Sequence, residues 1–186
     1  MKKRIIALLL VAALLLCTGC HKATLEGYKL FRSTPLGFSM EYPDFWSKTN
    51  DNDEGIAVFA TPPEGFADEV NDSLSVQRFV LDMEGEDAYN QYIKGYVADL
   101  EAKFKNYKLV SETDTTLGGE PAYQIVYEST SGDATETEGN SSELRLMQVF
   151  TQHDGYVYVV TYLAEFKSYS YFLTYVEKMI STFRFI

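Results

Sequence analysis

Cysteine and histidine stand together only once in this chain, in the run CTGCH from Cys17 to His21. The spacing C-x-x-C-H is that of a covalent haem attachment site, and C-x-x-C alone is typical of a redox dithiol. Both chemistries need two thiols that are retained in a folded domain. The apolar run directly before Cys17 indicates a third reading, in which the cysteines mark the end of a targeting segment.

The first 19 residues have the composition of a secretory signal peptide. Basic residues at positions 2–4 precede twelve apolar residues from Ile5 to Leu16, which are too few to span a bilayer as a helix. Two small residues then stand before Cys20. The segment resembles a bacterial lipoprotein signal, in which the cysteine after the lipobox is lipidated. It departs from that pattern at Cys17, where the lipobox usually carries leucine.

We therefore expect residues 1–19 to be a lipoprotein signal peptide, residues 20–27 a tether and residues 28–186 one domain. Cys20 would carry a diacylglycerol thioether, which anchors the chain on the extracytoplasmic face of the cell membrane. Cys17 would leave with the signal peptide, so the mature chain would keep no free thiol. Haem and dithiol chemistry are thereby disfavoured, and we expect no cofactor.

The charge balance limits the partners. Loss of residues 1–19 removes three basic residues and no acid, so the formal net charge falls from −11 to −14. Nucleic acids and anionic lipids are polyanions and repel such a chain. We expect the lipid on Cys20 to attach the chain to the membrane. An envelope protein or a glycan is the further partner that we expect, and we expect no binding of nucleic acid.

Histidine offers little for catalysis. Apart from His21 beside the anchor, the mature chain has only His153, in a His-Asp-Gly stretch that predicts a solvent-exposed β-turn. Zinc sites need clustered histidine or cysteine ligands, and nucleophilic catalysis needs a nucleophile paired with a base. We expect no catalytic residue and no metal ligand.

Two acidic clusters are candidate sites. Asp51, Asp53 and Glu54 offer oxygen ligands for calcium, but their spacing is not that of an EF-hand, and a solvated loop over residues 49–55 is favoured. Acids at positions 84, 86 and 87 cluster at the start of a helical pattern. They suit the start of a helix better than a glycosidase pair, whose carboxylates must face each other across a cleft.

Tyrosines are unusually frequent, with 14 in the chain. Three share one face of a predicted strand and three follow on a predicted helix: Tyr156, Tyr158, Tyr162, Tyr169, Tyr171 and Tyr175. An aromatic groove for a glycan, peptide or protein is one interpretation. We favour the other, in which the rings tile a sheet face that a helix covers.

The elements that position these residues follow from periodicity. Apolar residues three and four apart predict helices over 86–104 and about 166–180. Alternation and turn residues predict strands over 28–34, 37–42, 56–60, 74–81, 107–117, 121–130, 144–152 and 156–163, with a short strand or tail over 184–186. Strand-rich hairpins with two long helices indicate an α+β fold on an antiparallel sheet.

Four stretches resemble the PsbP-like family in order and spacing: GFSMEYPDFW at 37–46, GGEPAYQIVY at 118–127, DGYVYVVTY at 154–162 and MISTF at 179–183. The resemblance covers residues 28–186. It implies an α/β/α sandwich, with a central antiparallel sheet flanked by helices. Plant and cyanobacterial members are extrinsic photosystem II subunits, so the resemblance implies a non-enzymatic accessory role. No metal ligand of that family is carried over.

The sequence thus predicts a membrane-anchored extracytoplasmic lipoprotein with a non-catalytic binding or accessory domain. The alternatives are an envelope enzyme that uses carboxylates or a bound metal, and a purely structural component. Facing acids about 5–10 Å apart across a cleft would favour the enzyme. A contiguous exposed aromatic patch would favour the binding module.

Overall fold

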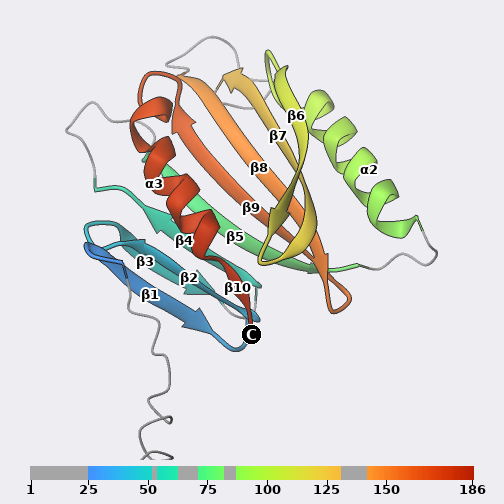
Figure 1. The fold of residues 1–186 in the computed structure, drawn as a ribbon. Coiled ribbons are helices and arrows are strands. Elements are labelled where there is room, and N and C mark those ends of the chain that lie inside the picture. The colour runs from blue at the N-terminus through green and yellow to red at the C-terminus, as the bar shows by residue number, and fades with distance from the viewer. Residues whose placement is uncertain (1–24, 52–53, 63–70, 82–86, 131–141) are drawn as a thin grey trace, which may run out of the picture.

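A computed structural model describes residues 25–51, 54–62, 71–81, 87–130 and 142–186. These residues form two β-sheets and two helices (Figure 1). The predicted signal peptide, Cys20, Asp53, the acids at 84 and 86 and most of the loop 131–142 lie outside the described residues.

The larger sheet has seven strands in the order β3-β4-β5-β9-β8-β7-β6, and every neighbouring pair is antiparallel. Two of its connections are tight turns between sequential strands, Gly118-Gly119 and Asp154-Gly155, and their residues have the positive φ that such turns need. The strands are β3 (Ser47–Asp51), β4 (Ile56–Ala60), β5 (Ser73–Val80), β6 (Lys108–Leu117), β7 (Glu120–Thr130), β8 (Glu143–His153) and β9 (Tyr156–Glu165).

The smaller sheet joins the two ends of the domain. It has the order β1-β2-β10, with β1 (Tyr28–Ser33), β2 (Phe38–Pro43) and β10 (Arg184–Phe185). Phe38 of β2 stacks on Phe183, which directly precedes β10, with ring centroids 5.1 Å apart. The first and last strands therefore share a neighbour, and their rings enter one core.

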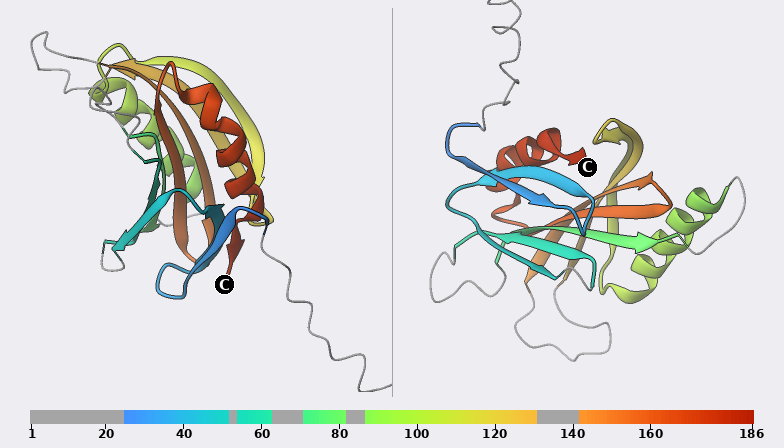
Figure 2. Two further views of the ribbon diagram at one scale, coloured as in Figure 1. Left: turned by 90° about the vertical axis from the view of Figure 1, so that its left-hand side faces the viewer. Right: turned by 90° about the horizontal axis from the view of Figure 1, so that it is seen from below.

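The two faces of the larger sheet have different covers (Figures 1 and 2). Helix α3 (Tyr169–Thr182) and the smaller sheet pack on one face, in a core that includes Tyr158, Val160 and Tyr162 of β9. Helix α2 (Ala88–Lys103) packs on the other face, against Val157 and Val159 of the same strand. Neither helix within the described ranges is long and apolar enough to cross a membrane.

The prediction of an antiparallel sheet with two helices is confirmed. The α/β/α description holds in part, because α3 shares its face with a second sheet that was not predicted. The expected loop over residues 49–55 is wrong in its first half: Ser47–Asp51 forms strand β3. All five residues of β3 are exposed, so this edge strand has no buried face and no alternation that would reveal it.

Candidate functional site

A groove of about 980 Å³ runs between helix α2 and the β6–β7 hairpin. We call it the α2 groove. Its apolar lining is Ile93, Val97, Ala98, Pro121 and Ala122, together with the rings of Tyr89 and Tyr123. Its charged lining is Asp87, Lys94, Glu101, Glu112 and Asp114. One hollow is therefore lined by both apolar surface and carboxylates.

The groove exists because α2 covers only part of its sheet face. The helix has only three buried residues, Ala88, Ile93 and Leu100. Strand β6 is exposed from Lys108 to Asp114 and has no strand on its outer side. The space between the helix and this outermost hairpin is thus left open.

Hydrogen bonds that involve two tyrosines of α2 hold the helix on the sheet beside the groove. The Tyr89 hydroxyl donates to the Phe150 carbonyl oxygen at 2.9 Å, and Gln148 Nε2 donates to the Tyr96 hydroxyl oxygen at 2.9 Å. The Tyr96 ring also packs edge-on against Phe150, with centroids 5.1 Å apart. Both tyrosines tie the helix to β8, which keeps one wall of the groove in place.

The opposite wall carries the acids. The Tyr123 hydroxyl donates to Glu112 Oε2 at 2.6 Å across the β6–β7 hairpin. Burial, the hydrogen bond to Glu112 and the nearby carboxylates raise the pKa of Tyr123 to about 12. Burial alone raises the pKa of Tyr89 to about 12. Both phenols are therefore neutral donors at physiological pH, and neither serves as a base.

The chemistry of the groove favours binding of cations. Among the described lining residues, four carboxylates face one base, Lys94. An ammonium or guanidinium group would find charge-assisted hydrogen bonds at Glu112 and Asp114, and its apolar stem would pack on Ile93 and Val97. A ligand that combines basic and apolar groups fits this lining.

His153 is not the exposed turn residue that the sequence predicts. It ends β8, its side chain is 27% exposed, and its ring stacks on Phe185 with centroids 3.9 Å apart and 12° between the planes. Its Nδ1 lies 3.1 Å from Glu120 Oε1. The ring is held between the β8–β9 turn and the C-terminal strand, which gives it a packing role.

Of the two acidic clusters, the structure gives the first a hydrogen-bonding role in a turn and places the described member of the second at a helix start. Asp51 Oδ1 accepts the backbone N–H of Glu54 at 3.1 Å and so stabilises the turn between β3 and β4. Asp87 stands at the N-cap of α2, but its side chain makes no capping hydrogen bond. Within the described ranges, no three of His, Cys, Asp and Glu gather as a metal site.

The tyrosines of β9 tile a covered face, as the favoured interpretation predicts. Tyr158 and Tyr162 are almost fully buried, and their hydroxyls donate to the carbonyl oxygens of Leu36 at 3.0 Å and Tyr169 at 2.9 Å. Tyr156 lies under the Arg78 guanidinium at 4.3 Å. On α3, Tyr169 is buried and Tyr171 is 69% exposed.

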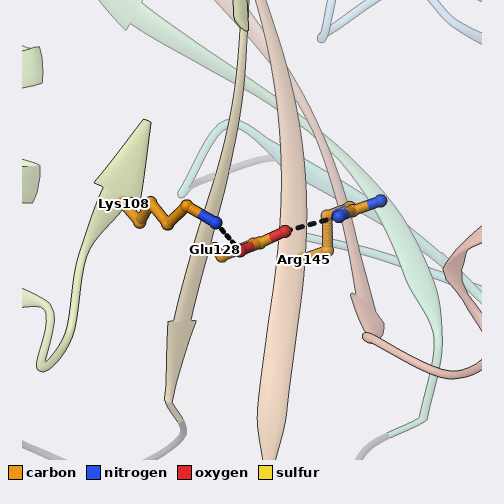
Figure 3. Close-up of polar contacts among 3 residues, drawn as sticks. All are labelled: Lys108, Glu128 and Arg145. Carbon is orange, nitrogen blue, oxygen red and sulfur yellow. Dashed lines mark hydrogen bonds and ion pairs between the residues drawn. The ribbon is translucent and has the colours of Figure 1, made fainter. Parts of the chain in front are cut away.

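A charged cluster on the α3 side of the larger sheet joins three strands (Figure 3). Glu128 of β7 pairs with Arg145 of β8 and, at 3.1 Å, with Lys108 of β6. The Arg145 guanidinium also lies 4.5 Å from the Phe166 ring centroid. The hydrogen bonds from Arg145 and then Lys108 hold the pKa of Glu128 below its ordinary value of 4.5. This cluster fastens the edge strand β6 to the sheet.

The groove was not predicted, although the sequence held a signal for it. Glu112 and Asp114 are two residues apart on a predicted strand, and Tyr123 lies on its hairpin partner. Period-two alternation places such side chains on one face of a sheet. The position of α2 beside them depends on tertiary packing, which this pattern does not contain.

Fold and site together define an antiparallel α+β domain with an acidic, partly apolar groove under its first helix. The chain belongs to the PsbP-like family, whose model matches residues 23–185. Comparison with curated protein sequences gave no match.

Solved structures share the fold at low sequence identity. The cyanobacterial PsbP of Synechocystis is 14% identical, with a TM-score of 0.56 over 91% of this chain and 99% of its own. LpqN of Mycobacterium tuberculosis, described as involved in cell envelope biogenesis, is 12% identical, with 0.53 over 79% and 82%. The Ran-binding protein Mog1p of Saccharomyces cerevisiae is 10% identical, with 0.54 over 85% and 95%.

Proposed function

We propose that this protein is an extracytoplasmic lipoprotein, anchored to the membrane by lipid on Cys20, whose PsbP-like domain is a non-catalytic binding module. The α2 groove is its binding site, and a basic, partly apolar segment of an envelope protein is its ligand. The observation that carries the proposal is the groove lining, which combines apolar side chains with the carboxylates of Asp87, Glu101, Glu112 and Asp114.

The anchor is supported by the signal-peptide pattern and the small residues before Cys20. The binding role is supported by the PsbP-like family match and by related folds in a Ran-binding protein and an envelope protein. The finer α/β/α layering is part of the proposal: α2 covers the face that carries the binding site, whereas α3 packs in the core that also includes the smaller sheet.

The anchor is tested by metabolic labelling with a fatty-acid analogue in cells that express the wild type or Cys20→Ala. We expect label only in the wild type, together with a mature N-terminus at residue 20. Equal labelling of the two proteins would remove the anchor from the proposal.

The binding site is tested with a fluorescent peptide of alternating lysine and phenylalanine and a matched peptide in which glutamate replaces lysine. Anisotropy should rise only with the lysine peptide, and molar salt should weaken the binding because it screens the carboxylates. Glu112→Gln combined with Asp114→Asn should lower the affinity about tenfold, which corresponds to roughly 1.4 kcal/mol.

Asp99→Asn is the matched control. Asp99 lies on α2 but does not line the groove, and it forms an exposed ion pair with Lys103 at 3.5 Å. Its substitution changes the net charge and leaves the groove intact, so binding should be unchanged. Equal losses in this control and in a Glu101→Gln variant would show a general charge effect and contradict the proposed site.

A further inference from the structure

Four aromatic side chains gather beside the start of the described chain: Tyr28, Phe45, Tyr171 and Tyr175. Phe45 is 46% exposed and Tyr171 69% exposed, whereas Tyr28 and Tyr175 are half-buried. The Phe45 ring packs edge-on against Tyr175 with centroids 5.5 Å apart, and Tyr171 lies one helical turn before Tyr175 on α3. We call this surface the aromatic patch.

The patch is tied to the N-terminal end of the domain. The backbone N–H of Asp44 donates to the Gly27 carbonyl oxygen at 2.9 Å, and Lys29 Nζ donates to the Asp44 carbonyl oxygen at 2.9 Å. Phe45 is therefore held next to the residues through which the tether enters the fold. Burial and the neighbouring Tyr175 raise the pKa of Tyr28, in keeping with its place in the same cluster.

The tether is short relative to the domain. Cys20 precedes Leu25 by five residues, which span at most about 18 Å when fully extended. A domain of this length has a radius of gyration of roughly 15 Å. A lipid on Cys20 would thus keep the surface around Leu25 nearest to the membrane, and the aromatic patch belongs to that surface.

We infer that the aromatic patch is the surface on which the domain rests against the lipid bilayer. This inference depends on the proposed anchor at Cys20. Tyrosine favours the membrane–water interface, where its ring is among the acyl chains' upper segments and its hydroxyl among the headgroups. Because the mature chain is strongly acidic, the contact is apolar rather than electrostatic, and its geometry does not depend on salt.

The contact orients the α2 groove away from the membrane. Figures 1 and 2 show β1, β2 and β3 at one end of the molecule and helix α2 at the other. The groove lies between α2 and the β6–β7 hairpin. With the patch on the bilayer, the groove faces the surrounding compartment and is open to a partner.

The full-length lipidated protein, reconstituted in phosphatidylcholine vesicles, tests this orientation. One cysteine is introduced for an NBD fluorophore, either by Thr174→Cys beside the patch or by Asp99→Cys on α2. Lipids brominated in their acyl chains should quench the label at 174 and leave the label at 99 unaffected, at low and at high salt. Equal quenching at both positions would overturn the inference.

Variants separate the patch from general surface effects. Phe45→Ser combined with Tyr171→Ser should abolish the quenching at position 174. Phe79→Ser, at an exposed aromatic residue of β5 outside the patch, should preserve it. Circular dichroism confirms that each variant is folded, and persistent quenching in the double variant would count against the patch.

Flotation with the vesicles distinguishes failure of the proposed anchor from failure of the proposed membrane contact. A protein that does not float contradicts the anchor, and this inference falls with it. A protein that floats but whose label at 174 is not quenched contradicts the membrane contact alone and leaves the proposed anchor standing.

Discussion

The imidazole of His153 lies flat on the phenyl ring of Phe185, with 3.9 Å between the ring centroids. Phe185 also meets Tyr158 and Phe183 edge-on, with centroids 5.0 Å and 5.1 Å away. Phe185 therefore packs between the end of β8 and the main core. These ring contacts hold strand β10 on the domain.

Removal of the Phe185 ring should destabilise the whole domain. We expect Phe185→Ala to lower the free energy of unfolding by about 2–3 kcal/mol, somewhat less than for a fully buried ring. His153→Ala should cost less. In a double-mutant cycle by urea denaturation, the pair should show a coupling of about 0.5–1.5 kcal/mol. Additive losses would mean that the stacking contributes nothing of its own.

Two glycines should respond oppositely to alanine. Gly37 has a φ of +76°, and a Cβ there would lie 2.6 Å from the Tyr158 hydroxyl oxygen, so Gly37→Ala should cost about 2–3 kcal/mol. Gly95 lies within α2 with open space around it, so Gly95→Ala should stabilise by about 0.5–1 kcal/mol. Thermal unfolding followed by circular dichroism measures both changes, and a gain at Gly37 would contradict the close approach.

The charged cluster of Figure 3 predicts a specific acid response. The pKa of Glu128 is lowered in the folded state, so its ion pairs stabilise above the unfolded pKa near 4.5 and are lost as the pH falls through the folded value. Glu128→Gln should cost about 0.5–1 kcal/mol at pH 7, because the group is partly solvated. At pH values below the folded pKa of Glu128, variant and wild type should have the same free energy of unfolding, which acid denaturation curves measure.

Alkaline pH should destabilise the domain. Burial raises the pKa of Tyr89 to about 12, and burial together with the nearby Glu112 raises the pKa of Tyr123 to about 12. A raised folded pKa means that the stabilisation is complete below the unfolded value near 10 and is lost as the pH rises toward 12. Denaturation midpoints should therefore fall steeply over this interval.

Replacement of Glu112 separates the causes of the Tyr123 shift. Its hydrogen bond and its charge both raise the pKa of Tyr123, after the larger effect of burial. Glu112→Gln should therefore lower that pKa toward 10 without reaching it. Titration by NMR of isotope-labelled tyrosine follows the single residue, and an unchanged value would place the whole shift on burial.

Much of the fold follows from local patterns. Spacing of three and four identifies α2, and Gly118-Gly119 identifies the β6–β7 turn, because both depend on residues close in sequence. β3 is polar and exposed on both sides, so it has no such pattern. Local patterns do not predict the α2 groove either, because it depends on the distance between the helix and the outermost hairpin. The prediction that His153 is solvent-exposed is wrong because its ring partner, Phe185, lies 32 residues further along the chain.

Strand β2 lies between β1 and β10, so the smaller sheet is incomplete until the last residues of the chain are available. Phe31 and Phe38, near the beginning, reach their core only when Phe183 arrives. A nascent polypeptide cannot close this core while its tail is still in the ribosome, and pairings so distant in sequence form slowly. Closure of the smaller sheet is therefore a late step in the folding of this domain.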